Sequence, residues 1–115
     1  MKPLVYLACP YSHPDMAVRC QRFDAVNVVA GALMRSGKLI FSPISHTHPI
    51  AVVGNLPMGW DFWHAYDRAF LEHSNAVIVL CLDGWQESTG VQAEIKIARE
   101  LGIPVEYADP RDYGI

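Results

Sequence analysis

Short apolar runs recur along this chain, separated by longer stretches in which apolar residues keep helical spacing. The runs fall within residues 4–9, 38–41, 76–82 and 103–107. Apolar runs of this length without polar alternation are typical of strands buried on both faces of a sheet. We therefore predict four strands at these positions.

The stretches between the runs predict three helices, at residues 15–35, 61–73 and 89–101. Gly37 suits the C-cap of the first helix, because glycine readily adopts the left-handed conformation found there. Residues 42–60 are rich in proline and glycine and predict one long irregular loop. A loop of that length in a small domain is usually functional or disordered.

Strands that alternate with helices predict an α/β fold with right-handed crossovers. We expect residues 1–115 to form a single domain, a three-layer sandwich with a parallel sheet of four or five strands, flavodoxin/Rossmann-like. Ligands of such sheets bind beyond the carboxyl ends of the strands. The segments expected at that edge are residues 10–14, 42–48 and 83–90.

The composition narrows the class of partner. The chain has a net charge of −3, which argues against a nucleic-acid polymer or an anionic membrane as partner. No apolar run approaches the length of a membrane span. Hydrophobic residues make up 51% of the chain and charged residues only 18%. That balance leaves apolar surface for a subunit interface, so we expect a homo-oligomer, a dimer or a tetramer.

Cysteine usage indicates the compartment. Cys9, Cys20 and Cys81 are odd in number and have no CxxC spacing. We interpret them as reduced thiols of a cytoplasmic protein, and we see no secretory signal peptide at the N-terminus.

The most informative motif is Ser88-Thr-Gly-Val-Gln-Ala-Glu94, which leads from a predicted strand into a predicted helix. The first turn of a helix has free N–H groups that can hold an anion. Thr89 with Gln92 fits a capping box, and Gly90 permits close approach to the backbone. Substrate binding is therefore expected at Ser88, Thr89 and Gly90.

Glu94 is the residue of this helix that points most directly to chemistry. At about 100° per residue it falls between Ala98 and Leu101, inside the apolar arc. A carboxylate placed there is costly to bury unless it is paired or used. The alternative is a glutamate at the rim of the apolar face whose carboxylate reaches water.

Three other side chains are candidates for chemistry or metal binding. Asp67 borders two aromatic residues on its helix, so it is either a partly buried proton donor or the partner of Arg68 or Lys38 in a salt bridge. His46 and His48 have the spacing of a weak metal-binding pair, but zinc needs at least one further ligand. We favour histidines near the ligand edge, with His46 close to the substrate and neither metal nor cofactor bound.

The chain resembles the nucleoside 2-deoxyribosyltransferase-like superfamily, within a small bacterial branch of unsettled activity. The resemblance rests on Val-Tyr-Leu-Ala-Cys-Pro-Tyr-Ser at residues 5–12, the apolar strand at 76–82, and Ser88-x-Gly90-x-x-x-Glu94. It covers essentially the whole chain at the level of the fold. It implies that Glu94 is a nucleophile attacking C1′ of the sugar, that Tyr6 holds its carboxylate, and that Asp67 protonates the leaving base.

The same resemblance bears on the substrate. At the position of Ser88 the chain resembles the branch that hydrolyses 5′-monophosphates, which also has serine there. Transferases acting on free nucleosides have aspartate at this position. The first loop has Pro10, Tyr11 and Ser12 where the nucleotide-hydrolysing branch has an arginine. Trp85 is peculiar to the small branch and is expected to stack on a base or ribose. Members of the superfamily associate and complete their sites with a second chain, which implies the same here.

Three functions remain open from the sequence. The first is cleavage or transfer at the N-glycosidic bond of a (deoxy)nucleoside or its 5′-monophosphate. The second is a non-catalytic module that binds or senses a nucleotide, for which an inward Glu94 is not required. The third is a metal-dependent hydrolase built on His46 and His48.

Overall fold

A computed structural model describes residues 2–115 of the chain. Its elements in chain order are β1 (Leu4–Ala8), α1 (Met16–Arg35), β2 (Leu39–Phe41), α2 (Pro43–Gly54), α3 (Trp60–Glu72), β3 (Ala76–Leu80), α4 (Thr89–Leu101), β4 (Val105–Ala108) and the short 3₁₀ helix η1 (Pro110–Tyr113).

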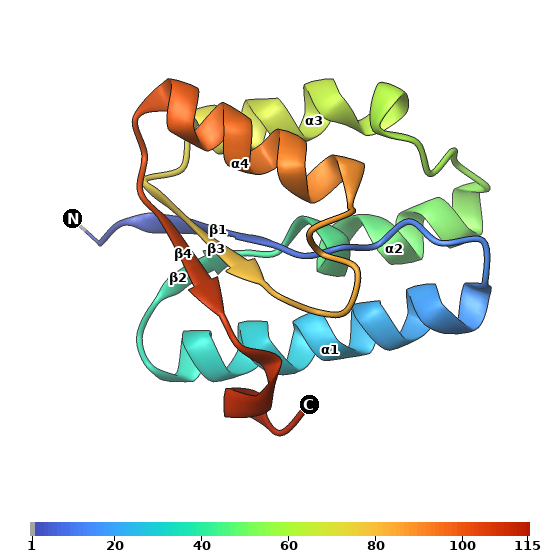
Figure 1. Cartoon of the computed structure of the whole chain (residues 1–115), viewed down its shortest axis with the longest axis horizontal. Helices are drawn as coiled ribbons and strands as arrows, with labels where there is room; N and C mark the ends of the chain where they lie inside the picture. The colour runs from blue at the N-terminus through green and yellow to red at the C-terminus, as the bar shows by residue number, and fades with distance from the viewer. Residues whose placement is uncertain (1) are drawn as a thin grey trace.

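The four strands form one parallel sheet in the order β2-β1-β3-β4. Figure 1 shows α1 on one face of this sheet and α3 with α4 on the other. The side chains of β1 alternate between the two layers: Val5 and Leu7 pack toward α1, whereas Tyr6 and Ala8 pack toward α3 and α4. The predicted α/β, flavodoxin/Rossmann-like architecture is confirmed, with four strands.

Local signals explain where two of the helices begin and end. The Asp15 side chain accepts a hydrogen bond of 2.9 Å from the Ala17 N–H, which caps the start of α1. After α1 the chain turns through Gly37 at φ +97°, as expected for glycine. Gly102 ends α4 in the same left-handed conformation.

The predicted loop at residues 42–60 is wrong, because most of it is the helix α2. Pro43 occupies the first turn, where proline loses no helical hydrogen bond, and Asn55 ends the helix in the left-handed conformation. Only Pro49 lies inside the helix. Packing of α2 against α1 and β1 outweighs this one lost donor. Figure 1 shows α2 at the carboxyl end of the sheet, beside α1.

Among residues 2–115, no helix is both long and apolar enough to cross a membrane. The three cysteines are free thiols, with Cys9 buried and Cys20 exposed.

Two leucines on the packed helices α3 and α4 give a matched test of the core. Leu71 is fully buried beneath α3, whereas Leu101 at the end of α4 is 38% exposed. Leu71→Ala should lower the free energy of unfolding by about 2–5 kcal/mol, because it leaves a cavity. Leu101→Ala should change it by less than about 1 kcal/mol. Urea denaturation measures both, and equal losses would show that the α3–α4 layer is not packed as described.

Candidate active site

The start of α4 lies at the carboxyl end of the sheet, but its cap differs from the prediction. Ser88, not Thr89, is the N-cap residue, and its Oγ accepts a hydrogen bond of 3.2 Å from the Val91 N–H. The expected capping box between Thr89 and Gln92 is therefore wrong, because the helix begins one residue earlier than it requires. Gly90 lies under the indole ring of Trp60, which would be 3.8 Å from a Cβ atom at this position.

Glu94 is buried one turn further along α4. Its side chain is 5% exposed and lies on the same face as Val91 and Ala98, against the sheet. The hydroxyl of Tyr6, in the middle of β1, donates a hydrogen bond to Glu94 Oε2. The alternative in which this carboxylate reaches out to water is therefore wrong.

The second carboxylate oxygen of Glu94 faces the pocket. In the part of the chain that the structure describes, Oε1 makes no hydrogen bond, yet no completely buried side-chain oxygen or nitrogen lacks a partner there. Oε1 must therefore reach the surface of the pocket that Glu94 lines. The Tyr6 hydrogen bond leaves this oxygen free for a ligand.

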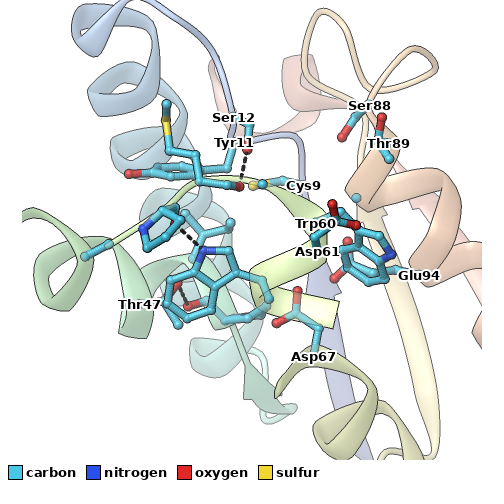
Figure 2. Close-up of a pocket in the computed structure, with 18 of the residues that line it drawn as sticks. Cys9, Tyr11, Ser12, Thr47, Trp60, Asp61, Asp67, Ser88, Thr89 and Glu94 are labelled. Carbon is cyan, nitrogen blue, oxygen red and sulfur yellow. Dashed lines mark hydrogen bonds between the residues drawn. The ribbon is translucent and has the colours of Figure 1, made fainter. Parts of the chain in front are cut away.

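Asp67 brings a second carboxylate to the same pocket from α3. Figure 2 shows it near Glu94 and Trp60. The proposed salt bridge with Arg68 or Lys38 is wrong, because Arg68 pairs instead with Glu72 at 3.1 Å. Within residues 2–115 Asp67 has no ion pair.

Burial shapes the protonation of this pair. It raises the pKa of Glu94 to about 8; the Asp67 charge adds to the rise and the Tyr6 hydrogen bond opposes it. Burial also raises the pKa of Asp67 to about 6, again opposed by the Tyr6 hydroxyl. The pKa of Tyr6 is raised by its own burial and then by both carboxylates, so the phenol stays neutral. Because both pKa values are raised, the two carboxyl groups share one proton near neutral pH.

The pocket has a volume of about 500 Å³. Figure 2 shows residues from the loop after β1, from α3 and from the start of α4 around it. The predicted site residues that line it are Tyr11, Ser12, Asp67, Ser88, Thr89, Gly90 and Glu94. Tyr6 does not line the pocket but supports Glu94 from the sheet.

Three of the predicted substrate-binding residues do not line this pocket. Pro10 is completely buried in the fold. Trp85 packs against Tyr107 on β4, with ring centroids 5.5 Å apart, so its expected stacking on a base is not seen at this pocket. His46 is exposed on α2, on the side facing Tyr66.

The two histidines of α2 do not form a metal pair. His48 is buried, with its Nδ1 hydrogen-bonded to the Tyr11 hydroxyl and its ring 4.4 Å from that of Phe23. His46 points in a different direction, because side chains two residues apart on a helix do not face each other. Among residues 2–115, no group of three or more histidine, cysteine or acidic side chains is arranged to hold a metal ion.

The aromatic wall of the pocket was not predicted from the sequence. Trp60 and Trp63 line it, two turns and one turn before Asp67 on the same face of α3. The Trp63 indole N–H donates to the Pro57 carbonyl at 2.7 Å, and the Ser12 hydroxyl donates to the Met58 carbonyl at 3.0 Å. The spacing of two tryptophans at i and i+3 with an aspartate at i+7 was the signal available.

The charged residues that line the pocket are all acidic. Its lining includes four carboxyl groups and neither lysine nor arginine; the acidic residues are Asp61, Asp67, Glu87 and Glu94. Arg22 lies close by, but its guanidinium donates to the carbonyls of Ser12 and Asp83, each at 3.1 Å. Arg22 thus ties the loop after β1 to the loop after β3.

Comparison with protein families shows the family to which the chain belongs. A family model described as a domain of unknown function (DUF1937) matches residues 3–109, and the chain belongs to this family. A search of curated proteins finds no match.

The raised pKa of Glu94 predicts a pH-dependent stability. A carboxyl group whose pKa is higher in the folded than in the unfolded state holds its proton more tightly when folded. The stability it gives is therefore lost as the pH rises from about 4.5 to about 8. Glu94→Gln removes this titration, so the melting temperature of the variant minus that of the wild type should rise by roughly ten degrees or more between about pH 5 and about pH 9.

Glu100→Gln is the matched control, because Glu100 is exposed on the same helix. Its melting-temperature difference from wild type should stay flat over that range. A flat difference for Glu94→Gln as well would show that Glu94 titrates like an ordinary surface carboxylate.

Proposed function

We propose that this protein cleaves or transfers at the N-glycosidic bond of a (deoxy)nucleoside or its 5′-monophosphate. The observation that carries the proposal is the buried Glu94 carboxyl group, held by Tyr6 and presenting its free oxygen to a pocket beside Asp67. Glycosidic cleavage commonly uses two such carboxyl groups. The same residues carry the resemblance to the nucleoside 2-deoxyribosyltransferase-like superfamily, to which we propose this family is related.

In the first step, the ionised Glu94 attacks C1′ with Oε1 while the C1′–N bond breaks. The bonding electrons leave with the base, and a neutral base takes the proton of Asp67. The transition state carries positive charge on the sugar, which a carboxylate in a water-poor site stabilises. The product of this step is a glycosyl ester on Glu94.

In the second step, water or another base attacks C1′ and the ester bond to Glu94 breaks. Asp67, now ionised, accepts the proton of the attacking water. The sugar leaves with a new hydroxyl group at C1′, or as a new nucleoside, and both carboxyl groups return to their starting states.

A neutral substrate requires the shared proton on Asp67, whereas burial favours it on Glu94. The Tyr6 hydroxyl donates to Glu94 Oε2 and so fixes the carboxyl group whose other oxygen attacks C1′. Tyr6 is thus a positioning residue for Glu94.

The non-catalytic alternative is favoured less. A module that only binds a nucleotide at the start of α4 needs no carboxyl group behind that helix. Burying Glu94 destabilises the fold at neutral pH, because its pKa is raised. No observation favours a metal-dependent hydrolase, since His48 is engaged with Tyr11.

The test is release of free base from a panel of nucleosides and 5′-monophosphates, followed by chromatography. Glu94→Ala should reduce the rate by at least about a thousandfold, because it removes the attacking atom. Tyr6→Phe should slow the reaction and shift its pH profile, because Glu94 loses its hydrogen bond. Glu100→Ala, with the same chemical change on the exposed face of α4, is the control and should react at the wild-type rate. Unchanged rates in Glu94→Ala would rule out the glutamate nucleophile.

We further propose that the protein self-associates near the pocket. Large apolar side chains are exposed on α2, in the loop after it and at the start of α3, where they include Ile50, Val52, Val53, Met58 and Phe62. Val53 is 90% exposed. Symmetric pairing is the commonest way to cover such a surface.

Light scattering tests this association. The wild-type protein should have at least twice the monomer mass at micromolar concentration. Val53→Lys should shift it toward the monomer, because a charge then has to be buried. Lys38→Met, which adds an apolar side chain elsewhere, should not. A wild-type monomer would contradict the proposal.

A further inference from the structure

The electrostatics of the pocket bear on which substrate it accepts. Asp61, Asp67, Glu87 and Glu94 come from α3, from the loop before α4 and from α4, and they meet around one cavity without a basic side chain in its lining. Glu94 is nine-tenths buried, with Oε1 free toward the cavity. Asp61 and Glu87 are exposed and Asp67 is partly buried, so an opposite charge in the pocket interacts most strongly with the less solvated pair, Asp67 and Glu94. The pocket is therefore complementary to a cation.

The aromatic wall has the same preference. Trp60 and Trp63 line the pocket next to these carboxyl groups, and Figure 2 shows Trp60 beside Glu94 and Asp61. The hydrogen bond from Trp63 to the Pro57 carbonyl fixes that indole before any ligand binds. The face of an indole ring attracts cations because its π electrons carry negative charge, and flat rings can also stack on it. A flat, positively charged ring satisfies both the tryptophans and the carboxylates.

The start of α4 is poorly suited to a phosphate. The Ser88 Oγ already accepts the Val91 N–H, and the Trp60 indole covers Gly90. Glu87 lies next to Ser88 in the pocket lining, so a phosphate there would face a carboxylate. The two hydrogen bonds of Arg22 hold its guanidinium on backbone carbonyls. An anion at this position would meet the Glu87 carboxylate, and neither lysine nor arginine lines the pocket to offset that repulsion.

We propose, building on the N-glycosidic function above, that the pocket selects nucleosides whose base carries a positive charge over neutral nucleosides and over 5′-monophosphates. N-glycosylpyridinium compounds and N7-alkylated purine nucleosides belong to this class. The bond that breaks joins C1′ to a ring nitrogen that carries the positive charge, as in a pyridinium ring, or shares it, as N9 does in the imidazolium ring of an N7-alkylated purine.

The chemistry of such a substrate fits the two carboxyl groups. When Glu94 attacks C1′, the electrons of the C1′–N bond neutralise the positive charge of the base, so no proton is needed for its departure. Asp67 can then be ionised from the start and accept the proton of the attacking water. The reaction consumes water and releases a neutral base, the free sugar and one proton.

Binding to Glu94→Gln, in which turnover is blocked, tests the charge preference by calorimetry. The three probes are nicotinamide riboside, which is a cation, its reduced form, which is neutral and of equal size, and nicotinamide mononucleotide, which adds a 5′-phosphate. The cation should bind about tenfold more tightly than either of the others. Asp61→Asn and Glu87→Gln, each added to this background, should lower the affinity for the cation by about two- to fivefold and leave the affinity for the neutral probe unchanged.

Glu100→Gln in the same background is the control for net charge, because Glu100 is exposed toward the other end of α4. It should change none of the affinities. Equal affinities for the cationic and neutral probes, or a mononucleotide that binds as tightly as the riboside, would overturn the inference.

Base release by the wild-type protein separates this inference from the function on which it rests. Release from neutral nucleosides but not from the riboside would refute the charge preference and leave the glycosidic function standing. Charge-selective binding without release of base from any compound would refute the glycosidic function instead.

Discussion

The hydrogen bond from Tyr6 to Glu94 joins the centre of the sheet to the helix that carries the candidate nucleophile. Tyr6 is completely buried on β1, which pairs with β2 on one side and β3 on the other. Its hydroxyl satisfies one oxygen of Glu94 and leaves the second for the pocket. A buried carboxyl group is tolerable only with such a partner or a bound proton, and this site has both. The positions of β1, α3 and α4 are therefore tied to the protonation of one side chain.

The sequence predicted this part of the molecule well because its signals are local. Apolar runs without alternation indicated β1 and β3, and helical spacing placed Glu94 inside the apolar arc of α4. The helix α2 could not be predicted in the same way. The number of prolines and glycines in residues 42–60 indicates a loop. However, Pro43 falls in the first turn of the helix, and packing of α2 against α1 and β1 outweighs the hydrogen bond that Pro49 cannot donate. That packing depends on residues distant in the sequence.

The composition of the pocket also depended on the fold. A net charge of −3 does not reveal that Asp61 and Glu87 meet Asp67 and Glu94 around one cavity. In the sequence Ser88 pointed to a phosphate. The Trp60 ring over Gly90 is a tertiary feature that the sequence could not reveal. A short motif can locate a site and still leave its ligand chemistry undetermined, since the ligand meets every wall of the pocket.

Cation recognition and the protonation of Glu94 are linked by the same physical chemistry. In the empty site burial favours the neutral acid, which reduces the energetic penalty of placing a carboxyl group behind α4. A positive base in the pocket would favour the carboxylate and release its proton. On this proposal, Glu94 becomes nucleophilic only when a substrate of the right charge is bound. A neutral nucleoside offers less of this effect and a phosphate opposes it, so the burial that raises the pKa of Glu94 also contributes to the selectivity of the site.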